Sequence, residues 1–173
     1  VALVMALAMK LDGARLTAVD PHAGGDRGPQ EIEPDRERGE ADYAVFHANL
    51  ARAGVAERVR HVRLPSMEAL GEVAEGLDML YVDGAHRYAP ARDDIAAWGA
   101  RVPRDGTMLV HDAYNAIGVM LAQLRLLFAS PRWRYEGRSR SLAQYRRDDL
   151  AAGGRAGNAL RQAVHLPYFV RNG

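Results

Sequence analysis

The sequence contains no cysteine, a single lysine (Lys10) and no apolar run long enough to cross a membrane. Without cysteine, disulfides, thiolate metal sites and cysteine nucleophiles are excluded, and a reducing compartment is compatible with the composition. The longest apolar stretch, VALVMALAM, is far shorter than the roughly 20 residues of a membrane span. It also lacks the flanking pattern of a signal peptide. We therefore expect a cytoplasmic protein without a membrane partner.

Net charge is almost absent as well. The 173 residues include 23 Lys and Arg against 22 Asp and Glu, so no overall field attracts the protein to nucleic acid or to anionic lipid. A chain of this length can bury about two-thirds of its unfolded surface, which predicts a single core.

Apolar runs alternate with helical periodicities along most of the chain. We expect strands at four runs: ARLTAVD, RVRHVRL, LDMLYVD and TMLVHD. We expect helices over five segments: residues 1–12, 40–53, 66–73 (with Ser66 as N-cap), 88–102 and 117–128. The segment from Pro21 to Gly39 has no period and predicts a loop. This order predicts an α/β fold with a Rossmann-like, doubly wound, mostly parallel sheet.

The C-terminal part differs in kind. WRYEG and SLAQYRR predict an antiparallel hairpin at the end of the sheet, and a helix near residues 156–165 precedes a tail. We therefore divide the chain into a domain at residues 1–147 and a C-terminal helix and tail at residues 148–173. The tail is also a candidate homodimer interface, through Leu166, Tyr168 and Phe169.

Three predicted strands end in an acid, at Asp20, Asp83 and Asp112. Ligands of parallel α/β sheets bind outside the carboxyl ends of the strands, so these acids are expected along the edge that carries the pocket. An acid such as Asp20 can accept hydrogen bonds from both hydroxyls of a ribose. Equally, it can cap a turn.

His86 follows Asp83 by three residues. An imidazole beyond a strand end can take a proton from a substrate hydroxyl near neutral pH, and a nearby carboxylate can orient it or share a metal with it. Alternatively, Gly84 makes the turn, Asp83 caps the next helix and His86 packs on its first turn. We favour the catalytic interpretation.

His111 and Asp112 end the next strand, so Asp112 should lie beside Asp83. Two carboxylates there repel one another unless a cation or a donor lies between them, and oxygen ligands suit Mg, Ca or Mn. Asp112 could instead bond a loop amide. Two alternatives therefore stand: a magnesium site at Asp83 and Asp112, with His111 as a further candidate ligand, or a hydrogen bond from a loop amide to Asp112 without a metal.

Two other groups of residues invite a simpler interpretation. Four histidines lack a partner at metal-ligand spacing and are expected at the surface or in interfaces: His22, His47, His61 and His165. Six arginines fall in the hairpin: Arg132, Arg134, Arg138, Arg140, Arg146 and Arg147. They could contact phosphates, but charge on an edge strand usually guards against aggregation, and we favour that role.

The order of these motifs resembles the class I S-adenosylmethionine-dependent methyltransferases, in particular the bacterial small-molecule group that includes catechol-type and sugar O-methyltransferases. The matching segments are LTAVDPH, RVRHVRLPSMEAL, LDMLYVDGAHRYAPARDDIAAW and VPRDGTMLVHDAY. They cover most of residues 1–147, and DGAHRY followed by GTMLVHD is fairly specific to the group.

This resemblance implies where the cofactor S-adenosylmethionine binds. Asp20 corresponds to the acid that holds the ribose, with Pro21 and His22 beside it. Ser66 and Met67 match positions that contact the adenine.

The resemblance also implies catalytic roles. Asp83 matches a metal-binding acid near the methyl donor, and Asp112 matches a second one. His86 stands where catechol-type enzymes carry a catalytic lysine, so it is the candidate general base. Ala113 departs from the pattern, because catechol-type enzymes have an amide ligand there; sugar-modifying members have two consecutive acids, where this sequence has His111 and Asp112. Metal dependence therefore stays open.

A further departure from the family pattern lies at the N-terminus of the sequence. The family begins with a strand and a glycine-rich turn that cradles the methionine part of the cofactor, whereas VALVMALAMK matches the helix that follows them. We expect that the sequence lacks the natural N-terminus, and that without it the sheet has a gap or borrows a strand.

The leading hypothesis is an S-adenosylmethionine-dependent O-methyltransferase that acts on a small-molecule hydroxyl, with His86 as general base. The alternative is a non-catalytic, degenerate methyltransferase fold that serves as a binding or dimerisation module. A nucleic-acid methyltransferase is disfavoured, because the strand that ends at Asp83 lacks the Asn-Pro-Pro-aromatic type of motif used for base-amine methylation.

Overall fold

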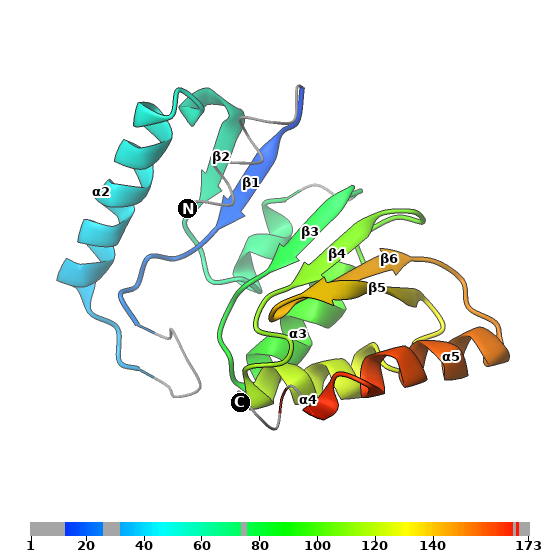
Figure 1. Ribbon diagram of the computed structural model, residues 1–173. Coiled ribbons are helices and arrows are strands. Elements are labelled where there is room, and N and C mark those ends of the chain that lie inside the picture. The colour runs from blue at the N-terminus through cyan, green and yellow to red at the C-terminus, as the bar shows by residue number, and fades with distance from the viewer. Residues whose placement is uncertain (1–12, 26–31, 74–75, 168, 170–173) are drawn as a thin grey trace. The chain divides into compact units, whose positions relative to one another are not determined.

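The computed structural model describes residues 13–25, 32–73, 76–167 and 169 (Figure 1). The predicted helix at 1–12 and the predicted interface residue Tyr168 lie outside these ranges. The chain divides into two compact units: unit 1 comprises Val1–Asp26 and Glu31–Val73, and unit 2 comprises Arg27–Gln30 and Ala74–Gly173. Among the described helices, none is long and apolar enough to span a membrane.

In unit 1 a helix packs against a pair of parallel strands. Strand β1 (Leu16–Val19) pairs with β2 (Val59–Val62), and α2 (Arg36–Arg52) lies between them in the chain. Phe46 and Leu50 of the helix form a small core with residues of both strands. This βαβ arrangement agrees with the expected parallel pairing.

Two local predictions in unit 1 were wrong. Helix α2 begins at Arg36, within the predicted loop, because the Asp35 side chain accepts a hydrogen bond from the Arg38 N–H at 3.1 Å and so caps the first turn. That turn is polar, so apolar periodicity alone could not find it. After β2, the chain forms only the short 3₁₀ helix η2 (Glu68–Gly71), and Met67 rather than Ser66 stands at its N-cap.

Unit 2 contains a four-stranded mixed sheet in the order β3-β4-β6-β5. Strands β3 (Met79–Val82) and β4 (Thr107–Val110) are parallel. Strand β6 (Leu142–Arg147) runs antiparallel to β4 and to β5 (Trp133–Ser139), which confirms the predicted hairpin.

The prediction of one mostly parallel sheet is not met by the described strands. They form a two-stranded parallel sheet and a four-stranded mixed sheet. The second sheet is mixed because β5 and β6 are joined by a tight turn, which permits only antiparallel pairing. The chain is thus an α/β protein with parallel pairs at β1-β2 and β3-β4 and a C-terminal hairpin.

Helices α3 (Tyr88–Gly99), α4 (Ile117–Leu126) and α5 (Ala152–Ala163) lie on one face of the four-stranded sheet (Figure 1). Alternate residues of β4 face these helices, so Met108 and Val110 are fully buried in the core of unit 2. In the tail, Leu166 and Phe169 pack partly against the same core.

The predicted apolar stripe of α4 is only partly buried. Met120 and Phe128 are in the core, but Ile117, Leu121 and Leu124 are 63%, 46% and 42% exposed. Gly118 explains this orientation, because a Cβ there would overlap the His86 carbonyl and the backbone next to it. The glycine face of α4 therefore packs inward together with Met120, and Ile117, Leu121 and Leu124 turn outward.

Candidate active site

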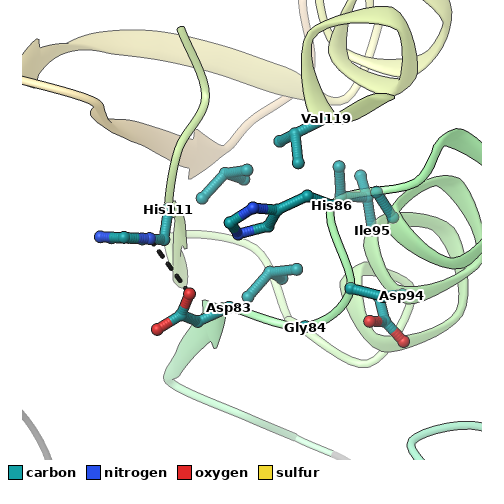
Figure 2. A pocket seen from close by; sticks show the side chains of 11 residues that line it. Asp83, Gly84, His86, Asp94, Ile95, His111 and Val119 are labelled. Atoms are coloured by element: carbon teal, nitrogen blue, oxygen red, sulfur yellow. Dashed lines mark ion pairs between the residues drawn. The ribbon is translucent and has the colours of Figure 1, made fainter. Parts of the chain in front are cut away.

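The carboxyl ends of β3 and β4 bring four polar side chains together, and Figure 2 shows three of them, Asp83, His86 and His111. Asp83 follows β3, His111 and Asp112 follow β4, and His86 lies in the turn between β3 and α3. Ligand atoms of Asp83, His86 and His111 all lie within 4.8 Å of one another. The predicted convergence of the acids of β3 and β4 at one sheet edge is therefore observed.

The four side chains form a continuous chain of contacts. The His111 Nδ1 lies 3.1 Å from Asp83 Oδ1 and 3.5 Å from Asp112 Oδ2. The same Asp112 oxygen lies 3.5 Å from His86 Nε2. Because the His86 and Asp112 side chains are only 24% and 19% exposed, their contact is partly shielded from water.

Asp112 is held in an unusual backbone conformation. Its φ of 48° is in the left-handed region, which costs energy for a residue other than glycine. Its carbonyl accepts hydrogen bonds from the N–H groups of Asn115 and Ala116, both at 3.1 Å, and the Asn115 side-chain amide donates to Asp112 Oδ1 at 3.4 Å. This leaves Oδ2 facing the two imidazoles. The sequence analysis missed Asn115, although an amide three residues after a strand-end acid was a usable signal.

A small cavity of about 10 Å³ adjoins His86, room for about one water molecule. Ile95 of α3 and Val119 of α4 line it with apolar surface (Figure 2). Asp94, which the sequence analysis also missed, lines the cavity and is 8% exposed. The Asp94 carboxylate can lie against the backbone of residue 84 because that residue is glycine: a Cβ there would lie 2.6 Å from Asp94 Oδ2.

Tyr81 is a further residue that the sequence analysis missed. Its ring centroid lies 6.2 Å from that of His111. Burial, together with the charge of the Asp83 carboxylate, raises the pKa of Tyr81 to about 12. The phenol therefore stays protonated at neutral pH and can donate a hydrogen bond to Asp83.

The other predicted binding residues belong to unit 1. Asp20 is exposed at the end of β1, and its Oδ1 accepts the His22 N–H at 2.7 Å. Side chains at and after β2 hold this turn: His61 Nε2 lies 3.1 Å from the Asp20 carbonyl oxygen, and Arg63 Nε donates to the Pro21 carbonyl at 3.3 Å. The Asp20 turn thus presents a carboxylate on a fixed backbone.

Ser66 and Met67 lie between β2 and η2 in the same unit. Met67 is 47% exposed, and Ser66 is half-buried. Both follow the strand that pairs with β1.

The prediction that the remaining histidines lie at the surface or in interfaces is wrong for His22, which is buried, whereas His47 and His61 are half-buried. His22 is 8% exposed, and its ring contacts those of Tyr43, Phe46 and His61 at centroid distances of 5.7, 5.6 and 5.0 Å. His47 Nε2 lies 3.2 Å from His61 Nδ1. Burial lowers the pKa of His61. This cluster brings together α2, β2 and the Asp20 turn, which sequence spacing does not reveal.

His165, the fourth of these histidines, is half-buried in unit 2. Its ring centroid lies 5.5 Å from that of Tyr114 and 5.8 Å from that of Tyr135. Burial lowers the pKa of His165, so this residue is also part of the packing of its unit.

Comparison with known families identifies the class of protein. The family model described as a methyltransferase domain matches residues 1–113, and the chain belongs to this family. Membership implies S-adenosylmethionine as the methyl donor. No curated protein matches the sequence.

Solved structures with the same fold include small-molecule methyltransferases. The O-methyltransferase NovP has a TM-score of 0.60 and 17% identity over 80% of this chain and 62% of its own. The calicheamicin methyltransferase CalS11 has a TM-score of 0.56 and 15% identity, over 84% of this chain and 65% of its own.

A third structure is TomG, an O-methyltransferase from Streptomyces achromogenes that is involved in tomaymycin synthesis and was solved in complex with S-adenosylmethionine. It has a TM-score of 0.50 and 15% identity, over 82% of this chain and 64% of its own. The chain therefore spans less than two-thirds of the length of each of the three proteins. At these identities the likeness establishes the fold.

Proposed function

We propose that this chain catalyses S-adenosylmethionine-dependent O-methylation of a small-molecule hydroxyl, with His86 as the general base. The observation that carries the proposal is the position of His86 Nε2, 3.5 Å from Asp112 Oδ2, beside a cavity at the carboxyl ends of β3 and β4. NovP and TomG, both O-methyltransferases with the same fold, support this acceptor class.

The cofactor-binding part of the proposal lies in unit 1. The exposed Asp20 carboxylate can accept hydrogen bonds from ribose hydroxyls, since His22 uses Oδ1 alone. Pro21 and His22 complete this turn, and Ser66 and Met67 would contact the adenine. The carboxylate acceptor of Asp20 and the exposed side chain of Met67 fit the ribose and the adenine of S-adenosylmethionine.

In the reaction, S-adenosylmethionine supplies a methyl group that is already activated for transfer. His86 takes the proton of the acceptor hydroxyl on the ring nitrogen that does not face Asp112, while the Asp112 carboxylate, 3.5 Å from Nε2, stabilises the imidazolium that forms. Asp83 would help to orient the reactants through its contact with His111. Correct positioning supplies much of the rate, because the donor needs no further activation.

The donor set also fits a divalent metal. The residues whose ligand atoms lie within 4.8 Å of one another are Asp83, His86 and His111, and these would hold the ion. Asp112, the second acid of the predicted site, is not in this group, and an ion bound to His86 would compete with its role as general base. Such an ion would polarise the acceptor oxygen. An imidazole among the ligands suits Zn or Fe better than Mg, which prefers oxygen; Mg stays a prediction.

We further propose that residues 1–147 carry catalysis and that residues 148–173 form an accessory helix and tail.

The test is methyl transfer from isotopically labelled S-adenosylmethionine to a panel of phenols, catechols and nucleotide sugars, with and without a chelator. We expect label on an acceptor oxygen, and loss of transfer after His86→Gln. Loss of transfer with the chelator would assign a metal. Cofactor binding without transfer to any acceptor would instead favour the non-catalytic binding module.

A further inference from the structure

A second cavity of unit 2 lies away from His86. It lies between the ends of α3 and α4 and the hairpin, and has a volume of about 160 Å³, against about 10 Å³ beside His86. Arg147 lines it, and the preceding Arg146 pairs with Thr107, the first residue of β4. The cavity is therefore near the amino end of β4, whereas His111 follows the carboxyl end.

The walls of this cavity are mainly apolar. Trp133, Leu127 and Ile95 line it and are nearly fully buried. Gly99 of α3 leaves space on the opposite side, since a Cβ there would lie 3.4 Å from Trp133 Cζ2. A volume of about 160 Å³ accommodates on the order of ten non-hydrogen atoms.

Three of the six arginines of the hairpin have local partners that account for their side chains. Arg134 pairs with Glu136 at 2.7 Å and with Asp148 at 3.2 Å. Arg146 and Arg138 donate to backbone carbonyls at 2.8 and 2.6 Å. The predicted guarding role of charge at the sheet edge accounts for these residues.

Arg132 and Arg147 differ from them. Both line the cavity, and over the described ranges neither side chain forms an ion pair with an acid. Asp149, which acts on Arg147 electrostatically, is itself paired with Arg104 at 2.7 Å. Burial, followed by the repulsion of Arg132, lowers the pKa of Arg147. The cavity thus holds two neighbouring cations without an anion between them.

Polar groups and an aromatic ring complete the arrangement. The guanidinium of Arg147 stacks on Trp133, with 5.3 Å between Cζ and the ring centroid. Ser130 is 7% exposed, and its Oγ accepts the Arg132 N–H at 3.1 Å. Since that bond uses a lone pair, the Ser130 hydroxyl proton remains available to an anion.

We propose that this cavity binds a small organic oxyanion. Its phosphate or carboxylate lies between Arg132 and Arg147, where forked guanidinium donors match two oxygens at once. Its apolar or aromatic body lies against Trp133 and Leu127. The proposal is independent of the methyl-transfer chemistry, because it uses none of the residues at the carboxyl ends of β3 and β4.

The test is fluorescence titration of the whole chain with phenyl phosphate, benzoate and inorganic phosphate as probes. Trp133 and Trp98 are the two tryptophans, and a ligand on Trp133 should change the emission. We expect saturable binding of phenyl phosphate or benzoate, and binding of inorganic phosphate that is at least about tenfold weaker because it buries no apolar surface. Which of the two aryl anions binds more tightly identifies the head group.

Two variants and a matched control complete the experiment. Arg147→Met and Arg132→Met should each weaken the preferred aryl anion by on the order of tenfold, the value of a charge-assisted hydrogen bond. Arg140→Met, which removes an exposed arginine at the hairpin turn, should change the affinity less than about twofold. Arg132 is exposed, so its variant stays informative if Arg147→Met unfolds. Absence of saturable binding, equal loss in the control, or inorganic phosphate as good as the aryl anions would each overturn the proposal.

Discussion

His86 and Asp112 form the pair on which the proposed chemistry depends. The Asp112 carboxylate is fixed on one side by Asn115 and faces His86 with its other oxygen. An imidazole held in this way can receive a proton without reorienting, which is the property that a general base needs.

Replacing His86 by Gln should therefore separate catalysis from binding. Gln can still donate to Asp112 but cannot accept a proton at neutral pH, so we expect turnover to fall by about 10² to 10⁴-fold. The affinity for S-adenosylhomocysteine, measured by calorimetry, should change little. An equal loss of turnover and of affinity would show that His86 supports the structure of the site rather than proton transfer.

Strand β2 and Arg63, the residue directly after it, hold the turn that carries Asp20. His61 and Arg63 contact the carbonyls of Asp20 and Pro21, and Arg63 also pairs with Glu40 at 2.7 Å. The position of the proposed ribose-binding acid is thus set by an element more than forty residues away in the chain.

Arg63→Met should consequently weaken S-adenosylhomocysteine binding by on the order of tenfold, because the Pro21 carbonyl loses its charged donor. Arg60→Met is the matched control: Arg60 lies on β2, three residues before Arg63, but contacts Glu72, and its loss should leave the affinity within about twofold. Equal effects of the two substitutions in calorimetry would contradict the positioning role of Arg63.

Helix α4 is held against the His86 turn by Gly118. Adding a methyl group there would overlap the His86 carbonyl, so Gly118→Ala should destabilise the protein by about 1 to 3 kcal/mol. Gly157→Ala is the control, because a Cβ at that position of α5 meets nothing within 4 Å; it should stabilise by up to about 1 kcal/mol. Urea unfolding measures both changes. A neutral Gly118→Ala would show that the close approach is not required.

The sequence allowed these elements to be predicted to different degrees. Strand ends at Asp83 and Asp112 were predictable because a buried apolar run stops abruptly at a polar residue. The attachment of α5 was not, because it depends on buried polar side chains: the Asn158 Oδ1 accepts the Tyr135 N–H at 2.6 Å, and the Tyr145 hydroxyl donates to Gln162 Oε1 at 2.8 Å. Periodicity detects apolar faces and is blind to such contacts.

Site residues divide in the same way. Asp83 and His86 are close in sequence and share one short motif, so their proximity was predictable. Asp94 and the histidine pair of unit 1 are brought into place by helix packing, and their neighbours lie on other elements. No single stretch of sequence contains that information.

Across the whole molecule, titrating groups limit stability at both ends of the pH scale. Burial lowers the pKa of His61 and His165, so below about pH 6.5 the unfolded chain binds more protons and the native state loses stability as pH falls. Burial raises the pKa of Tyr114, Tyr135 and Tyr145. These tyrosines stabilise the fold below about pH 10, and their contribution is lost as pH rises further.

We therefore expect the free energy of unfolding, measured with urea, to be highest between about pH 7 and pH 10 and to fall on both sides. A curve that stays flat from pH 8 to pH 11 would contradict the burial of the three tyrosines.

Calorimetric titration with S-adenosylhomocysteine tests most directly the cofactor site on which the proposed methyl transfer depends. We predict micromolar binding to the wild-type chain and a loss of at least about tenfold after Asp20→Asn, because the amide cannot replace a charged acceptor for two hydroxyls. Glu57→Gln, which removes an exposed acid elsewhere in unit 1, should leave the affinity unchanged. No binding, or binding that is indifferent to Asp20, would contradict the proposed cofactor site.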